Sequence, residues 1–269
     1  MLIKNLKLIF ADAPSRRYLI RKYILHPIII LLSYILYFLY PFIPKKILRL
    51  KKPIFIIGCS RSGTTIFVDL FSRHKDIANW SEAGQVLDLN YFNPNNNHQK
   101  IKLRKIDYIR IKTLFSFFAY FKNKKRFVNK NPMNSLNIVY LRKIFPDCFF
   151  IHLVRDKKAV INSHLNMIKK DSFRKLYPYG LFVKPINWKK YSSLSPYQQF
   201  AHQREEIVNY IEGTLKNDKK YIKVRYEEFC LDTHKTLRRL DFFCGLNSNN
   251  RDFSKIPKSL KNQNYKYET

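Results

Sequence analysis

The feature that most constrains the fold is a strand–loop–helix pattern in residues 53–72, PIFIIGCSRSGTTIFVDLFS. Residues 54–57 are apolar and mostly β-branched, as in strands buried inside a parallel sheet. A loop bounded by Gly58 and Gly63 follows, and from Ile66 apolar residues recur at helical spacing. Backbone N–H groups of such a loop and of a helix N-terminus point at one spot, so this stretch predicts an anion-binding loop.

The residue after this loop separates two kinds of phosphate site. The spacing Gly58-x4-Gly63 matches a nucleotide P-loop, in which the next residue is a Lys that reaches the β- and γ-phosphates. Here that residue is Thr64, and the cation is Arg61, inside the loop. A kinase-like or GTPase-like P-loop protein therefore stays an alternative, with Thr64 as the evidence against it.

A second phosphate site is predicted at residues 148–163. The apolar run 148–154, CFFIHLV, reads as a central strand that delivers Arg155 to its carboxyl edge, where ligands of open parallel sheets bind. A helix over residues 157–169 then carries Ser163, and one cation with one hydroxyl can bind a phosphate monoester. In the structural alternative, Arg155 pairs with a nearby carboxylate, Asp156 or Glu227, and Ser163 faces solvent.

Strands alternate with helices along the rest of the chain. This alternation predicts an α/β fold, a three-layer sandwich around a central, mostly parallel sheet. The expected strands are 54–57, 77–80, 126–130, 148–154 and 221–225. The expected helices are 64–73, 100–122, 134–144, 157–169, 196–212 and 231–244, and residues 172–195 read as irregular.

The N-terminal part differs in character from the rest. Residues 1–23 are basic, and residues 24–43 are almost wholly apolar over a length that can span a bilayer. We therefore expect a membrane-associating segment over residues 1–50 and a catalytic domain over residues 51–269. The apolar helix can span once, lie in the interface as a Pro-bent anchor, or pack in a core. Basic residues on both flanks leave the orientation open, and we expect the domain on the cytoplasmic side.

The net charge limits the classes of partner, and the cysteine content indicates the compartment. The chain has 51 Lys and Arg against 19 Asp and Glu, a formal net charge of +32. This excess indicates either a phosphate-rich or membrane partner, or the biased amino-acid usage that an AT-rich genome gives. It comes with no nucleic-acid-binding motif, so we expect no nucleic-acid partner. Four cysteines without metal-site spacing favour a reducing compartment.

Several of these segments resemble sulfotransferases that use 3′-phosphoadenosine 5′-phosphosulfate (PAPS). Residues 60–65, Ser-Arg-Ser-Gly-Thr-Thr, resemble their 5′-phosphosulfate-binding loop, and Arg155 with Ser163 resembles their 3′-phosphate motif. Residues 130–132, Lys-Asn-Pro, followed by FPDCFFIHLVRD, are similar to bacterial and carbohydrate-type members. Two further segments match, 224–229 (VRYEEF) and 244–246 (CGL). The resemblance covers residues 53–246.

The resemblance implies a role for each site residue. Arg61 and Lys130 would stabilise charge on the transferring sulfuryl group. Arg155 and Ser163 would bind the 3′-phosphate, and Tyr226 would border the adenine. The expected cofactor-binding residues of the 5′ loop are Arg61, Ser62, Gly63, Thr64 and Thr65. No metal is expected, because a sulfuryl group carries less charge than a phosphoryl group.

One departure from the family concerns the general base. The cytosolic small-molecule enzymes have Lys-Thr-His, whose His accepts the acceptor's proton, and this chain has Pro132 at that position. Glu82 is our candidate base, with His98 as the runner-up and a surface or capping role as the alternative for Glu82. Three other histidines read as structural: His74, His152 and His164. Three lysines of the tail could close over the 3′-phosphate: Lys258, Lys261 and Lys266.

The sequence thus predicts a sulfotransferase that moves a sulfuryl group from PAPS to a hydroxyl or amine. The expected acceptor is a glycan, a glycolipid or a lipid, and a membrane surface is an expected partner. The alternatives are the kinase-like P-loop enzyme and a non-catalytic basic protein that binds membranes or nucleic acid.

Overall fold

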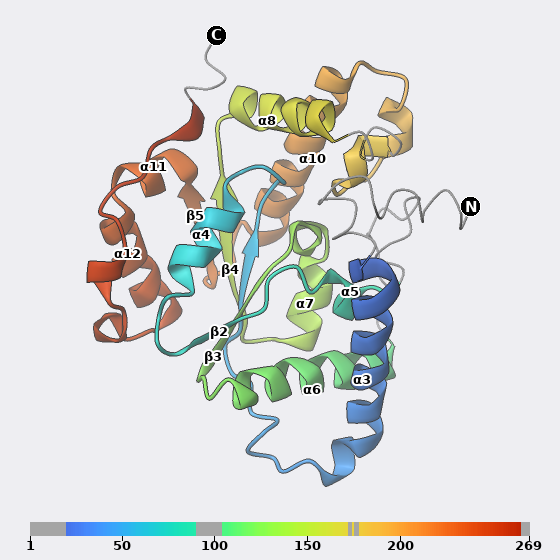
Figure 1. The fold of residues 1–269 in the computed structure, drawn as a ribbon, viewed down its shortest axis with the longest axis vertical. Helices are drawn as coiled ribbons and strands as arrows, with labels where there is room; N and C mark the ends of the chain where they lie inside the picture. Colours follow the sequence, from blue (N-terminus) through green and yellow to red (C-terminus); the bar gives the residue numbers. More distant parts are fainter. Residues whose placement is uncertain (1–19, 90–103, 172–173, 175–177, 265–269) are drawn as a thin grey trace.

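The described residues form a five-stranded parallel sheet at the centre of the molecule (Figure 1). The computed structural model describes residues 20–89, 104–171, 174 and 178–264. The strands are β1 (Ile54–Ile57), β2 (Ile77–Asn79), β3 (Arg126–Lys130), β4 (Phe149–Val154) and β5 (Tyr221–Arg225), in the order β2-β3-β1-β4-β5. Because β1 lies between β3 and β4, the loops that leave these three strands meet at one edge. The predicted strands and fold class are confirmed.

Helices cover both faces of the sheet. The α-helices are α3 (His26–Leu39), α4 (Thr64–Phe71), α5 (Gly84–Leu87), α6 (Lys105–Phe121), α7 (Ile138–Ile144), α8 (Lys157–Lys170), α10 (Pro196–Leu215), α11 (Tyr226–Leu231) and α12 (Thr233–Cys244). The shorter turns are η1 (Arg21–Leu25, π-helical) and the 3-10 turns η2 (Tyr40–Phe42), η3 (Pro132–Leu136), η4 (Pro178–Leu181), η5 (Trp188–Tyr191), η6 (Ser248–Asn250) and η7 (Phe253–Lys255).

The core has two layers because side chains of each strand alternate between faces. Phe55 and Ile57 of β1 pack with residues of α6, α7 and α10. Ile54 and Ile56 pack on the opposite face with residues of α4, α11 and α12. Figure 1 shows these two helical layers on either side of the sheet, which makes the three-layer sandwich.

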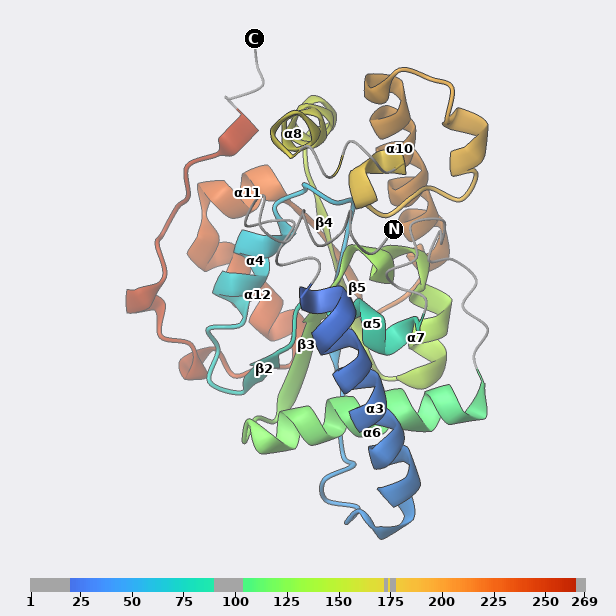
Figure 2. The same ribbon diagram turned by 45° about the vertical axis from the view of Figure 1, so that its right-hand side comes forward.

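The N-terminal apolar helix lies outside the α6 layer and crosses α6 in both views (Figures 1 and 2). Within the described part of the chain, residues Arg21–Phe42 form one helix that is long and apolar enough to cross a membrane. Only Ser33 and Leu36 of α3 are buried. The helix therefore contacts the domain along a narrow face.

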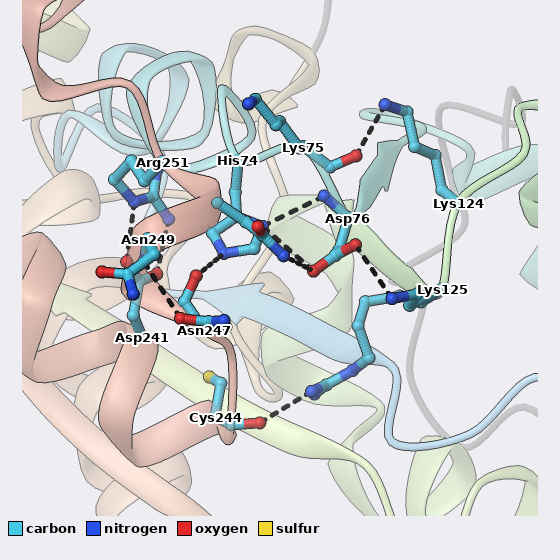
Figure 3. A network of polar contacts seen from close by, with 12 residues as sticks. His74, Lys75, Asp76, Lys124, Lys125, Asp241, Cys244, Asn247, Asn249 and Arg251 are labelled. Carbon is cyan, nitrogen blue, oxygen red and sulfur yellow. Dashed lines mark hydrogen bonds and ion pairs between the residues drawn. The ribbon is translucent and has the colours of Figure 1, made fainter.

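A polar network fastens the segment after α12 to the start of β2 (Figure 3). His74 Nε2 lies 2.9 Å from the backbone oxygen of Asn247, and the Asn250 side chain donates to Asp76 Oδ2 at 2.8 Å. Arg251 forms a fully buried ion pair with Asp241 at 2.6 Å and donates to the last carbonyls of α4. The network thus joins β2, α4 and α12, and the structural role predicted for His74 agrees with it.

Two local departures from the expected helices have capping residues as their cause. The helix expected over 134–144 is divided at Asn137, whose backbone is not helical and whose side chain donates to the Met133 carbonyl at 2.9 Å; η3, capped by Asn131, precedes it and α7 begins at Ile138. The helix expected from residue 231 begins at Thr233, where Asp232 accepts from the Lys235 amide. The short helix α11 before it was not predicted.

Candidate active site

The loop between β1 and α4 is held in one conformation by close backbone contacts. A Cβ at Gly58 would lie 2.4 Å from the backbone oxygen of Leu153 in β4. The Ser135 hydroxyl accepts from the Gly58 amide at 2.9 Å and donates to the Gly58 carbonyl at 3.0 Å. Arg61 and Gly63 have φ values of 69° and 84°, so the loop turns sharply into α4. The first N–H groups of α4 have no acceptor inside the helix, as at any helix start, and they adjoin this loop.

The two predicted phosphate sites are in direct contact. Arg61 Nε donates to Ser163 Oγ at 3.0 Å, and Arg155 donates to the Arg61 carbonyl at 3.1 Å. Ser163 is buried, which argues against the alternative in which it faces solvent. Arg155 Nε also donates to the Asn264 side chain at 2.7 Å, and Asn264 in turn donates to Glu227 at 2.8 Å. Arg155 is thus held by the β1–α4 loop through Arg61 and by the C-terminal segment through Asn264.

Tyr226 closes the other side of the loop. Its ring would lie 2.4 Å from a Cβ at Gly63, and the Arg155 guanidinium carbon lies 4.7 Å from the ring centroid. Burial raises the pKa of Tyr226 to about 12, so the phenol is neutral. A flat, neutral ring beside a guanidinium is suited to bordering a planar base.

Lys130 and Glu82 face each other across the carboxyl ends of β3 and β2. Lys130 Nζ lies 2.8 Å from Glu82 Oε1, and Arg21 from η1 lies 2.7 Å from Glu82 Oε2. The Glu82 amide donates to the Lys130 carbonyl at 2.6 Å, and Glu82 has a φ of 57°. Burial opposes ionisation of Glu82, but Lys130 and then Arg21 outweigh it and lower the pKa of this carboxyl to about 2.

The remaining predicted donors surround the same loop. Ser62 and Thr64 are buried, whereas Thr65 is exposed on the first turn of α4. The buried Ser60 hydroxyl has no hydrogen-bond partner among the described residues. A buried hydroxyl without a partner inside an amide-rich, arginine-lined loop fits a bound anion. The residues present therefore fit the 5′-phosphosulfate of PAPS.

The histidines of the central layer are structural, as predicted. His152 lies 3.0 Å from the Tyr221 hydroxyl and His164 lies 3.0 Å from the Val160 carbonyl. Burial lowers the pKa of each to about 3. His98 and Lys266 fall outside the described residues. No group of three His, Cys, Asp or Glu residues able to hold a metal occurs in the described ranges.

Sequence reasoning missed four residues of this site. Ser60 lies within the recognised loop and carries a hydroxyl there, which was the available signal. Asn264 belongs to the tail, where only lysines had been considered. Arg21 and Ser135 lie far along the chain from the groups that they contact, and no sequence pattern marked them.

Comparison with known proteins now decides the family. The model of the sulfotransferase family matches residues 53–250, which include both predicted phosphate sites. The chain belongs to the sulfotransferase family. The match confirms the prediction, made from the sequence, that this sulfotransferase is a member of that family and a transferase.

The name of one curated relative says that it acts on a menaquinone. The omega-hydroxy-beta-dihydromenaquinone-9 sulfotransferase Stf3 of Mycobacterium bovis is 30% identical over 138 residues. The match covers 50% of this chain and 33% of the relative, so the chain spans about one third of that protein's length.

Solved sulfotransferase structures share the fold. STF1 of Mycobacterium tuberculosis has a TM-score of 0.53 at 14% identity, with 80% of this chain and 73% of that chain covered. STF9 of Mycobacterium avium has a TM-score of 0.52 at 14% identity, with 80% and 71% covered. At this identity the likeness concerns the fold alone.

Proposed function

We propose that this sulfotransferase transfers a sulfuryl group from PAPS to a hydroxyl, or an amine, of a membrane-associated acceptor. A bond forms between the acceptor oxygen and sulfur, and the bond between sulfur and the phosphate bridging oxygen breaks. Adenosine 3′,5′-bisphosphate leaves, and the acceptor's proton goes to Glu82.

The observation that supports this donor is the contact between the two phosphate sites. Arg61 from the β1–α4 loop hydrogen-bonds Ser163 from α8, while Arg155 holds the Arg61 backbone. A donor with phosphates at both the 3′ and 5′ positions would engage both sites at once. Tyr226 beside Gly63 supplies a ring for the base between them.

Each site residue has a role in this proposal. The 5′-phosphosulfate is bound by the Ser62–Thr65 segment and the first turn of α4, and the 3′-phosphate by Arg155 and Ser163. Arg61 and Lys130 stabilise the charge that develops on the sulfuryl and leaving oxygens. PAPS supplies the sulfuryl group, and the chain supplies binding, charge and the base.

Glu82 becomes a stronger base when Lys130 turns to the donor. With Lys130 and Arg21 on its two oxygens, its pKa is about 2, and so weak a base removes a proton poorly. The negative sulfuryl group competes with Glu82 for Lys130. Lys130 is the larger of the two influences that lower the carboxyl pKa, so when it turns away burial raises that pKa against Arg21 alone.

The position of the site supports a membrane-associated acceptor. Arg21, on the turn before the apolar helix α3, contacts Glu82 directly. A lipid or a glycolipid is therefore the favoured acceptor, with a glycan as the third class, and the menaquinone relative is consistent with a lipid. Four buried free cysteines suit a reducing compartment and so support a catalytic domain on the cytoplasmic side.

Calorimetry and sulfur transfer from labelled PAPS test the proposal. We expect the wild type to bind PAPS and adenosine 3′,5′-bisphosphate, and Arg155→Ala to weaken both about 10- to 100-fold, because a charged hydrogen bond is lost. Arg61→Ala should also lower transfer to lipid extracts. Arg239→Ala, an exposed arginine of α12, is the matched control and should bind normally.

Two results would contradict the proposal. Binding of Mg-ATP without PAPS binding would favour the kinase-like alternative. Salt-dependent retention on nucleic acid without affinity for PAPS would favour the non-catalytic alternative.

A further inference from the structure

The helix at the N-terminus presents a continuous apolar surface to the outside. Exposed apolar residues recur every four and three positions from η1 through α3 to η2, so they lie on one helical face. Their exposed fractions run from 45% to 82%. We call this face the outer stripe; it consists of Ile24, Ile28, Leu31, Ile35, Phe38 and Phe42. A soluble surface helix carries polar residues on this face, so the outer stripe marks an interaction surface.

The opposite face of the same helix is fixed to the domain. Ser33 is fully buried and accepts a hydrogen bond from Arg110 of α6 at 3.0 Å. Arg110 is itself buried and also donates to the Val86 carbonyl at 3.0 Å. At the start of α3, His26 Nε2 lies 3.2 Å from the Leu89 carbonyl oxygen. A helix that left the domain to cross a bilayer would strip a buried guanidinium of its Ser33 and expose core residues, which is strongly unfavourable.

Both ends of the helix are basic. Arg21 and Lys22 lie at its start, and Lys45, Lys46 and Arg49 follow its end and are mostly exposed. Lysine and arginine near the ends of an apolar helix favour the side of the membrane with anionic lipids. Both ends can satisfy this preference together only if the helix lies along the surface. At 22 residues the helix would cover about 33 Å of that surface.

We propose that the outer stripe of α3 lies in the plane of an anionic lipid bilayer, with its apolar side chains at the boundary of the acyl chains. The basic ends contact the phosphate headgroups. A second copy of the chain is a poorer occupant. In a symmetric dimer through this stripe, basic ends would face basic ends in either direction, within a chain of net charge +32.

The surface also bears on how the acceptor is reached. Arg21 stands at the first turn of the helix and contacts Glu82 at 2.7 Å. The candidate base therefore lies beside the lipid-facing helix. This step rests on the proposed function: an acceptor hydroxyl held in the lipid surface has a short path to Glu82.

Co-sedimentation of the full chain with vesicles tests the lipid contact. We expect sedimentation with phosphatidylcholine vesicles that contain phosphatidylglycerol, and weaker binding to phosphatidylcholine alone. Phe38→Asp, at a side chain that is 70% exposed, should lower partitioning about tenfold or more, because a charge enters the apolar boundary. Phe242→Asp is the matched control: it makes the same change at an 88% exposed Phe on α12, across the sheet, and should bind like the wild type.

The result that would overturn lipid binding is equal sedimentation of Phe38→Asp and the wild type, with both folded by circular dichroism. A wild-type dimer that Phe38→Asp dissociates, with no vesicle binding by either, would assign the stripe to a second copy.

Thiol labelling separates lying from spanning. All four native cysteines are buried, so the thiols to be labelled are those of Lys22→Cys, at a partly exposed position, and Lys46→Cys, at an exposed one. With protein bound to sealed vesicles, a membrane-impermeant maleimide should label both variants from outside. Protection of one end alone would show a spanning helix and contradict the proposal. Neither assay requires sulfuryl transfer, so a failure here leaves the proposed function standing.

Discussion

Glu82 lies between two cations, and this placement limits how its carboxylate can act. Lys130 and Arg21 each take one of its oxygens, so the carboxylate is ionised at neutral pH but weakly basic. The backbone at Glu82 is left-handed, a conformation that non-glycine residues adopt rarely and that is concentrated at functional sites. Both observations favour a role in the chemistry over a surface or capping role.

Replacing Glu82 by Gln keeps the shape of the side chain and removes its charge and basicity. We expect kcat to fall about 10²- to 10⁴-fold, the usual contribution of a general base, with little change in PAPS affinity. Rapid-mix assays of turnover beside calorimetry of PAPS binding would measure the two effects. Turnover that is unchanged in Glu82→Gln would exclude Glu82 as the base.

The same variant has a second readout in stability. The pKa of Glu82 in the folded protein is about 2, below its ordinary value of 4.5, so folding favours the ionised form. The stabilisation is complete above about pH 4.5 and disappears as the pH falls towards 2. The difference in unfolding free energy between wild type and Glu82→Gln should therefore shrink over this interval, as measured by urea titration. A difference that stays constant with pH would contradict the ion pairs.

At the scale of elements, the start of α4 sets the shape of the proposed donor site. Gly63 lies at the helix N-terminus in a left-handed conformation, and Tyr226 from α11 packs where a Cβ would stand. The packing of the loop, the helix start and the Tyr226 ring against one another thus requires a glycine at position 63.

Gly63→Ala should displace the Tyr226 ring and strain the loop. We expect a loss of about 1–3 kcal/mol in unfolding free energy and weaker PAPS binding. Gly213→Ala is the internal control, because Gly213 lies inside α10 with no atom within 4 Å of an added Cβ. It should stabilise the protein by about 0.5–1 kcal/mol and leave binding intact. Chemical denaturation and calorimetry measure both, and equal effects of the two variants would refute the role of Tyr226.

Sequence reasoning predicted the regular elements well, and it failed where a short polar side chain intervened. The helix predicted from residue 196 does begin at Pro196, and Ser195 and Gln198 make both reciprocal hydrogen bonds of a capping box there. The chain breaks at Asn137, whose side chain donates to the Met133 carbonyl, and α11 ends where Asp232 caps α12. These residues fit several conformations, so periodicity alone could not place the breaks.

At the scale of the whole molecule, the C-terminal segment connects the start of β2 with the residue that follows β4. From the network at His74 it runs past α12 and α11, where Leu260 donates to the Cys230 carbonyl at 2.7 Å, and reaches Arg155 through Asn264. The family resemblance located Arg155 and Ser163. The support from Asn264 and Arg21 depends on tertiary contacts across more than 60 positions, which one sequence does not reveal.

The buried pair of Arg251 and Asp241 should carry much of the stability of this connection. Arg251→Ala leaves a buried carboxylate without its partner, and we expect a loss of about 3–5 kcal/mol in unfolding free energy. Lys255→Ala breaks an exposed pair with Asp252 nearby and should cost less than about 1 kcal/mol. Thermal and urea unfolding measure both. A small effect of Arg251→Ala would mean that the segment is held by its backbone contacts instead.

The contact between Arg21 and Glu82 has a consequence for how the rate would scale. For a molecule adsorbed through α3, the proposed base lies beside the lipid-facing helix, and encounters with the proposed lipid acceptor would take place in two dimensions. The relevant concentration is then the mole fraction of acceptor in the surface, not its amount per volume of solution. Extra lipid without acceptor would dilute the substrate and slow turnover, although every molecule of enzyme and acceptor were still present.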